Sequence, residues 1–237
     1  MWTQQQLVQP VPPLKLFHSF QPSNHAKIQS LSKLNSTQNL KTLTLEELPP
    51  NALRRKKDAE WRGGFSLGVD LGMARTGIAL SKGFTFRPLT VLKLRGQKLE
   101  VRIMNIAEEE VWIIFCPEAD EFIIGLPKSC DSEETIQSNI VRSVAGRLAI
   151  RAAERGWRVY LHDEYGTTNA AIDRMINMGV NRSQQKKQDA YAAVMLLERY
   201  FSTSGQKTEL VVPKNLELQG KLRSGPPRDD DYLSDDD

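Results

Sequence analysis

Three acidic residues stand where the surrounding sequence predicts a buried strand or the start of a helix. Asp70 interrupts FSLGVDLG, whose other residues are typical of the centre of a sheet. Glu164 directly follows the apolar stretch WRVYLHD, and Asp189 precedes the apolar run AYAAVMLL. Because a buried carboxylate without a partner costs several kcal/mol, such positions require a compensating group.

Divalent cations are the compensating groups that best suit grouped carboxylates. Neighbouring carboxylates raise one another's pKa, whereas Mg²⁺ or Mn²⁺ prefers a few carboxylates together with waters and phosphate oxygens. Two such ions, about 3.5–4 Å apart, suit in-line hydrolysis of a phosphodiester, one generating hydroxide and the other stabilising the leaving oxygen. We therefore expect Asp70, Glu164 and Asp189 to be the catalytic residues and metal ligands of a nuclease.

Each acid also has an ordinary structural explanation. Asp70 could cap a turn, Glu164 could be a solvated loop residue, and Asp189 could be a first-turn acid of a helix. The prediction of a metal site therefore depends on all three residues meeting in one fold.

The elements expected between these acids predict how they would meet. Hydrophobic periodicity favours strands over about 65–71, 76–82, 86–93, 121–125 and 157–162, and helices over about 97–110, 134–155, 168–178 and 188–201. A three-stranded antiparallel meander followed by alternating helices and strands predicts an α/β protein with a mixed five-stranded sheet and helices on both faces. This is the element order of the ribonuclease H-like fold. Sites in such sheets form at the carboxyl ends of strands, where we place the three acids.

Composition divides the chain into three parts. The first part is residues 1–60. Up to Leu45 it has no Asp or Glu and is rich in Ser, Thr, Gln and Asn, and the basic run LRRKK follows. We expect a largely disordered transit peptide and linker, and the absence of arginine from that stretch favours a chloroplast over a mitochondrion; a merely disordered terminus is the alternative. Residues 61–203 form the expected nuclease domain, and residues 204–237, ending in SGPPRDDDYLSDDD, predict a disordered acidic tail.

Bulk composition indicates a globular protein and does not by itself indicate a partner. Hydrophobic residues make up 40% and charged residues 26%, and no apolar run reaches the roughly 18 to 20 residues of a membrane helix. Cys116 and Cys130 form no CxxC pair, which favours free thiols in a reducing compartment. The net charge of +3 depends on the four lysines among the first 45 residues, so an argument for nucleic acid must rest on local groups.

Four motifs in chain order resemble the YqgF family, also called RuvX, over about residues 66–201. The family's G-x-D-x-G-x-[KR]-R-x-G is present as GVDLGMARTG, and its VVGLP with a following Asp-containing loop as IIGLPKSCD. Its DERLTT corresponds to DEYGTT, and its closing DxxAAxxILQxYL corresponds to DAYAAVMLLERYF. Four motifs in the right order are far more specific than a lone GxDxG.

The resemblance implies a nuclease with Asp70, Glu164 and Asp189 as its metal-binding catalytic acids. It implies maturation of the 5′ end of 16S-type ribosomal RNA or, by an older analogy, cleavage of four-way DNA junctions. With a transit peptide, such a protein looks like a chloroplast homologue, since chloroplasts have their own 16S-type ribosomal RNA. Tyr165 replaces a family arginine, and if that arginine contacts phosphate, substrate binding is weakened while the metal ligands remain.

Basic and hydroxyl side chains near the three acids are the expected phosphate contacts. They come from the first hairpin, the loop after Pro127, the DEYGTT motif and the polar segment before Asp189. The expected substrate-binding residues are Arg75, Lys128, Thr167, Thr168, Arg182, Lys186 and Lys187. The two threonines could equally cap the following helix.

Other chemistry-bearing residues of the core favour ordinary roles or leave two interpretations open. Arg147, Arg151 and Arg155 share one face of the long helix, near Arg142, and either follow a phosphate backbone or form a solvated helix face. His162 has no His or Cys partner at metal-ligand spacing, which favours an ordinary histidine at a strand end.

Three classes of function remain open. The first is a Mg²⁺-dependent nuclease acting on structured RNA or branched DNA, as a monomer or a homodimer and with no membrane partner. The second is a non-catalytic RNA-binding factor of ribosome assembly, motivated by Tyr165 and the near-neutral charge of the chain beyond residue 45. The third is an actin-like phosphotransferase, which would need two domains where a core of about 140 residues supplies one.

Overall fold

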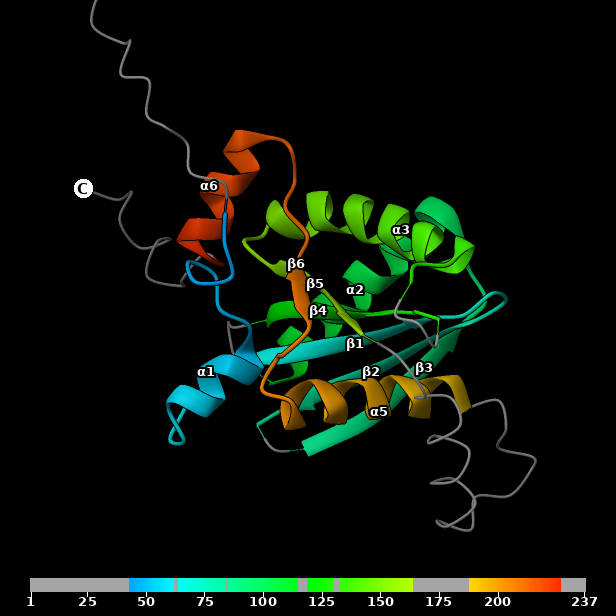
Figure 1. Cartoon of the computed structure of the whole chain (residues 1–237), viewed down its shortest axis with the longest axis horizontal. Helices are drawn as coiled ribbons and strands as arrows, with labels where there is room; N and C mark the ends of the chain where they lie inside the picture. Colours follow the sequence, from blue (N-terminus) through cyan, green and yellow to red (C-terminus); the bar gives the residue numbers. More distant parts are fainter. Residues whose placement is uncertain are drawn as a thin grey trace, which may run out of the picture. The chain divides into compact units, whose positions relative to one another are not determined.

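The computed structural model describes residues 43–61, 64–83, 85–114, 119–129, 133–163 and 188–226 (Figure 1). In chain order the elements are α1 (Asn51–Lys57), β1 (Phe65–Leu71), β2 (Thr76–Lys82), β3 (Thr85–Leu92), α2 (Gly96–Ile114), β4 (Ala119–Leu126), α3 (Ile136–Ala153), β5 (Arg158–Asp163), α5 (Gln188–Ser202), β6 (Thr208–Leu210) and α6 (Leu216–Ser224). The helix expected over 168–178 lies outside the described residues.

One mixed sheet organises the fold, with strand order β3-β2-β1-β4-β5-β6. The meander β1–β2–β3 is antiparallel. β4 pairs in parallel with β1, and β5 pairs in parallel with β4. The predicted mixed sheet is therefore confirmed, but it has six strands rather than five, because β6 pairs antiparallel with β5. With three residues, Thr208–Leu210, β6 is too short to show an alternating pattern.

Helices cover both faces of the sheet, as predicted (Figure 1). α2 and α3 pack on one face, and α5 packs on the other. Alternation along β1 sends Leu67 and Val69 into the larger core under α2 and α3, whereas Gly68 faces α5. Asp70, two residues beyond Gly68, therefore faces α5 as well.

Residues 43–57, which we call the N-terminal strap, are built into the fold. Leu43 and Leu48 are only 4% and 6% exposed, and they share a hydrophobic cluster with apolar side chains of α6. The Tyr160 hydroxyl on β5 donates a hydrogen bond to the Leu48 carbonyl at 2.9 Å. The sequence analysis placed this segment in a largely disordered transit peptide and linker because of the acid-free composition up to Leu45 and the basic run LRRKK.

A buried carboxylate, Glu121 on β4, anchors the strap to the sheet. One oxygen accepts hydrogen bonds from Ser66 Oγ at 2.6 Å and from the Tyr200 hydroxyl at 2.8 Å, and the other accepts the Asn51 backbone N–H at 3.0 Å. Burial, reinforced by the Glu121 charge, raises the pKa of Tyr200 well above its usual value, so the phenol remains a donor. Both carboxylate oxygens thus have donors, which offsets the cost of burying the charge.

The segment after α5 also contains regular structure that the sequence analysis did not expect. β6 extends the sheet, and α6 packs against α3 with its own capping residue, since Asn215 Oδ1 accepts the Glu217 N–H at 2.8 Å. Arg223 of α6 pairs with Glu47 of the strap at 2.5 Å, which joins the two segments. The aspartate-rich end, from residue 227, lies outside the described residues. None of the described helices is long and apolar enough to cross a membrane.

Removing the strap should destabilise the domain. A chain starting at Asp58 leaves Glu121 without its Asn51 donor and uncovers the cluster around α6. We expect its free energy of unfolding, measured by urea denaturation, to fall by about 3–5 kcal/mol. A chain starting at Leu43 is the matched control and should keep the stability of the full chain. Equal stability of the two truncated chains would contradict this role of the strap.

Candidate active site

The first turn of α5 lies in backbone contact with the hairpin that carries Asp70. Asp70 on β1 is the register partner of Gly77 on β2. A Cβ atom added to Gly77 would lie 1.8 Å from the Asp189 carbonyl oxygen and 2.9 Å from the Ala190 nitrogen. Only glycine permits this approach, so the hairpin and the helix together bring Asp189 beside Asp70.

A second glycine keeps the same helix close to β1 further along. A Cβ atom on Gly68 would lie 2.7 Å from Leu197 Cγ and 2.9 Å from the Ala193 carbonyl oxygen. Asp189 and Ala193 are one helical turn apart, while Asp70 and Gly68 are two strand residues apart, so the two contacts have matching spacing. The alignment of α5 over β1 and β2 is thereby fixed at two points.

Asp189 carries an ion pair with Arg75, which stands immediately before β2. Arg75 Nε lies 2.7 Å from Asp189 Oδ2, and the two side chains are 42% and 25% exposed. Asp189 Oδ2 is itself buried and accepts no aligned hydrogen bond from any described group, so the contact is one of charge. The α5 N-terminus, where Asp189 lies in the first turn, adds further positive potential.

The donor set present suits a hard divalent cation. The described residues contain no group of three His, Cys, Asp or Glu side chains that could hold a metal ion. Asp70 and Asp189 nevertheless offer carboxylate oxygens on one face, and a buried Oδ2 without a hydrogen-bond donor is a natural cation ligand. Glu164, the predicted third ligand, lies outside the described residues, as do Thr167, Thr168, Arg182, Lys186 and Lys187.

The end of β5, just before Glu164, has a structural histidine. His162 is 2% exposed, its Nδ1 lies 3.0 Å from Thr208 Oγ1, and its ring contacts Tyr200 edge-on. Burial, with the charge of Arg199 second, lowers the pKa of His162 to about 4, so the ring is neutral near pH 7. The expectation of an ordinary strand-end histidine agrees with these contacts, since His162 joins β5 to β6.

The start of α3 lies at the same edge of the sheet as Asp70. Gln137 Nε2 donates a hydrogen bond to the Leu71 carbonyl at 2.9 Å, one residue beyond Asp70. A capping box between Thr135 and Ser138 begins the helix. Lys128 lies in the preceding loop, where its backbone forms an isolated antiparallel β-bridge with Glu134. Lys128 is thus at the end of β4, where the sequence analysis placed it, whereas Gln137 carried no sequence signal.

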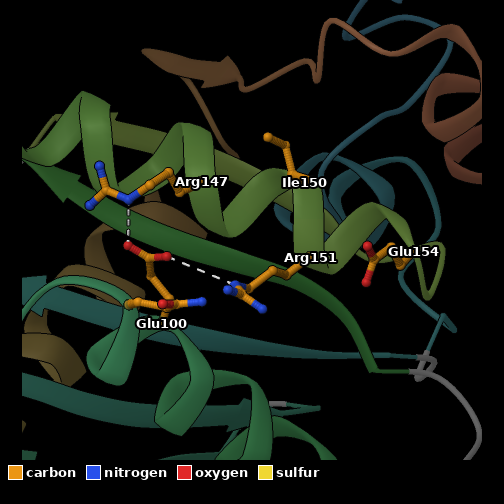
Figure 2. A pocket seen from close by; sticks show the side chains of 6 residues that line it. Glu100, Arg147, Ile150, Arg151 and Glu154 are labelled. Atoms are coloured by element: carbon orange, nitrogen blue, oxygen red, sulfur yellow. Dashed lines mark hydrogen bonds and ion pairs between the residues drawn. The ribbon is translucent and has the colours of Figure 1, made fainter. Parts of the chain in front are cut away.

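The arginines of α3 pair with carboxylates. Figure 2 shows Arg147 and Arg151 directed at Glu100 of α2, with Nε–oxygen distances of 2.6 and 3.8 Å. Glu100 is only 1% exposed, at the bottom of an open groove of about 430 Å³ between α2 and α3. Arg155, expected on the same helix, lies two residues beyond the end of α3 and pairs with Glu108 at 2.5 Å.

Arg142 has a similar structural partner set. Its Nη1 lies 2.8 Å from Glu209 and its Nε 2.9 Å from Glu134, and these two carboxylates raise its pKa above the usual value. Of the two interpretations of the helix face, these pairs favour the structural one over a path for phosphates.

Together, the meander, the parallel strands and the aspartates at their carboxyl ends define an α/β domain of the ribonuclease H-like class. Residues 64–203 match the family model described as "RuvX: Holliday junction resolvase". The chain belongs to the RuvX family. This is the family that the four sequence motifs indicated.

Similar proteins occur in several bacteria. The chain is 29% identical over 144 residues to a Lactococcus lactis subsp. lactis protein named "Putative pre-16S rRNA nuclease", covering 60% of this chain and 96% of that protein. Proteins of the same name from Nocardioides sp. and Cronobacter sakazakii are 33% identical over 147 residues and 31% over 145, covering 60% of this chain and 90% and 99% of theirs.

A solved structure, T. thermophilus RuvC in complex with Holliday junction substrate, is similar with a TM-score of 0.39 and 16% identity, over 62% of this chain and 99% of that one. This likeness is too distant to carry an argument.

A methyl group at position 77 should disrupt the site. In Gly77→Ala the α5 first turn must move away from β2, so we expect a loss of about 1–3 kcal/mol of stability, measured by urea denaturation, together with weaker binding of Mn²⁺. Gly146→Ala is the control, because no atom lies within 4 Å of the added methyl group in α3, and it should gain about 0.5–1 kcal/mol. A Gly77→Ala protein that matches wild type in stability and Mn²⁺ affinity would refute the assignment.

Proposed function

We propose that this protein is a metal-dependent nuclease that hydrolyses phosphodiester bonds in structured RNA, at the 5′ end of a precursor of 16S-type ribosomal RNA. The observation that carries the proposal is the placement of Asp189 beside Asp70 through the close contact at Gly77. Membership in the RuvX family and the names of the bacterial relatives support a nuclease, and those names favour ribosomal RNA as substrate.

In this proposal, Asp70, Asp189 and Glu164 hold Mg²⁺ or Mn²⁺. Two cations held there would supply a nucleophilic hydroxide from water and stabilisation of the leaving oxygen. Asp70 presents its carboxylate from a rigid central strand, and Asp189 presents its own from a helix start fixed by Gly77. Such rigid placement lowers the barrier because the ligands need no rearrangement as charge develops on the phosphate. Lys128 and Arg75, at this edge, would bind substrate phosphate. The sequence adds Thr167, Thr168, Arg182, Lys186 and Lys187, which lie outside the described residues, as further predicted phosphate contacts.

A branched DNA substrate is the second candidate, and the description of the family model favours it. Symmetric cleavage of a four-way junction requires a two-fold dimer, so a monomeric protein in solution would argue against this candidate. A non-catalytic RNA-binding role in ribosome assembly is the third, motivated by Tyr165 in place of a family arginine.

We propose the chloroplast as the location, with the mitochondrion as the alternative. The acid-free composition of the first 45 residues supports a transit peptide. Because Leu43 and Leu48 are buried in the domain, the mature protein would begin at or before Leu43. Mass spectrometry of the protein recovered from the organelle tests both statements, and a mature start beyond Leu43 would contradict the second.

Replacing one proposed ligand should abolish cleavage. We expect Asp70→Asn to reduce cleavage of a precursor of 16S-type ribosomal RNA by at least about a hundredfold, while the thermal unfolding temperature stays within a few degrees of wild type. The assay compares the precursor RNA with a four-way DNA junction at equal concentrations, in Mg²⁺ and in Mn²⁺. Asp58→Asn, at an exposed position after α1, is the matched control and should cleave as wild type does.

The outcomes separate the three candidates. The proposal is supported if wild type cleaves the RNA and Asp70→Asn does not. Cleavage of the four-way junction but not of the RNA by wild type favours the DNA enzyme. Wild-type protein that binds the RNA without cutting it in either metal favours the assembly factor. Unchanged RNA cleavage by Asp70→Asn would exclude the proposed catalytic role of Asp70.

A further inference from the structure

We propose that Arg75 is the counter-ion of the metal-free site and competes with the divalent cation for Asp189. This inference rests on the proposed metal-dependent function. It assigns to Arg75 a positioning role that precedes any contact with substrate: its guanidinium occupies the side of Asp189 that the cation needs.

The first step is the geometry of the pair. Arg75 Nε lies 2.7 Å from Asp189 Oδ2, the same buried oxygen that accepts no aligned hydrogen bond from the described residues. The guanidinium occupies one side of this oxygen, so a cation bound through the same oxygen competes with Arg75 for its negative charge. The two positive groups also repel one another at such a distance, which favours one or the other.

The second step is that the backbone holds both partners in place. Arg75 ends the turn that begins at Gly72, where an added Cβ atom would lie 2.8 Å from the Arg75 carbonyl oxygen. The guanidinium of Arg95 donates a hydrogen bond to the Met73 carbonyl within this turn. The Asp189 backbone is fixed through Gly77, so the ion pair joins two anchored backbones, and the more exposed partner is the Arg75 side chain.

The third step is the balance of charge. Asp70 is the register partner of Gly77, and the Asp189 backbone lies against Gly77, so the two acidic residues are near neighbours, and neighbouring carboxylates repel. In the metal-free protein Arg75 supplies the positive charge that offsets this repulsion. When a cation supplies that charge, the arginine becomes redundant, and its side chain, already 42% exposed, turns toward solvent.

The chain offers a matched control at Arg102. Its Nη1 lies 2.6 Å from Glu109 Oε1, and its side chain is 41% exposed, so length, charge and exposure are close to those of Arg75. This pair lies on α2, away from the aspartates. A change in cation affinity that follows from loss of any surface arginine would therefore appear in Arg102→Ala as well.

The test measures Mn²⁺ binding to the full-length chain by isothermal titration calorimetry, without substrate. We expect Arg75→Ala to bind Mn²⁺ about three- to tenfold more tightly than wild type, and Arg75→Lys, which keeps the charge, to change less. Arg102→Ala should bind as wild type does, and Asp70→Asn should lose the site. Thermal unfolding gives a second readout: Arg75→Ala should be less stable than wild type without metal and regain that difference at saturating Mn²⁺.

The results distinguish this inference from the proposed function. If wild type binds Mn²⁺ through Asp70 but Arg75→Ala binds equally or more weakly, the competition is refuted while the nuclease proposal stands. If wild type binds no Mn²⁺, both the metal chemistry and the inference are wrong. An equal gain of affinity in Arg102→Ala would also overturn the inference, because the effect would then be general electrostatics.

Discussion

The close approach of α5 to the first hairpin is the constraint on which the candidate site depends. Two glycines on neighbouring strands, Gly68 and Gly77, remove the side chains that would otherwise hold the helix away from the sheet. Ordinary packing of a helix on a sheet keeps backbones apart by the thickness of a side-chain layer. Here the backbones touch, so Asp189 in the first helical turn of α5 is brought near the part of β1 that carries Asp70.

The carboxylates at the two ends of the strands differ in how many hydrogen-bond donors they have. At one end Glu121 receives donors on both oxygens from β1, α5 and the strap, and it is sealed by them. At the other end Asp189 lies beside the partly exposed Arg75, and one of its carboxylate oxygens has no aligned donor among the described residues. A satisfied carboxylate stabilises a fold, whereas an unsatisfied one keeps affinity for a ligand. The carboxylate that stabilises the fold and those proposed to bind a ligand therefore lie at opposite ends of the strands.

Much of this fold could be predicted from the sequence because its signals are local. The strands around Asp70 and the helix after Asp189 follow from hydrophobic periodicity, and their order predicted the mixed sheet. The elements outside the family-matched region could not be predicted in this way. The strap buries only a few apolar residues, and β6 has three residues, so their structure depends on partners distant in the chain, such as Glu121 and Tyr160.

The site was predictable as a set of residue types and only partly as geometry. Asp70 and Asp189 follow from their unusual positions, and Gly77 stands in the printed motif GVDLGMARTG. The ion pair between Arg75 and Asp189 could not be foreseen, because it depends on how the turn before β2 meets the start of α5. The pairing of α3 arginines with Glu100 likewise depends on the crossing of two helices, which periodicity does not fix.

The ion pair between Glu47 of the strap and Arg223 of α6 joins segments from nearly opposite ends of the described chain. Translation delivers the strap long before α6, so the early leucines have no lasting cover until almost the whole polypeptide has left the ribosome. The cluster that these segments share is therefore among the last parts of the described fold that can form.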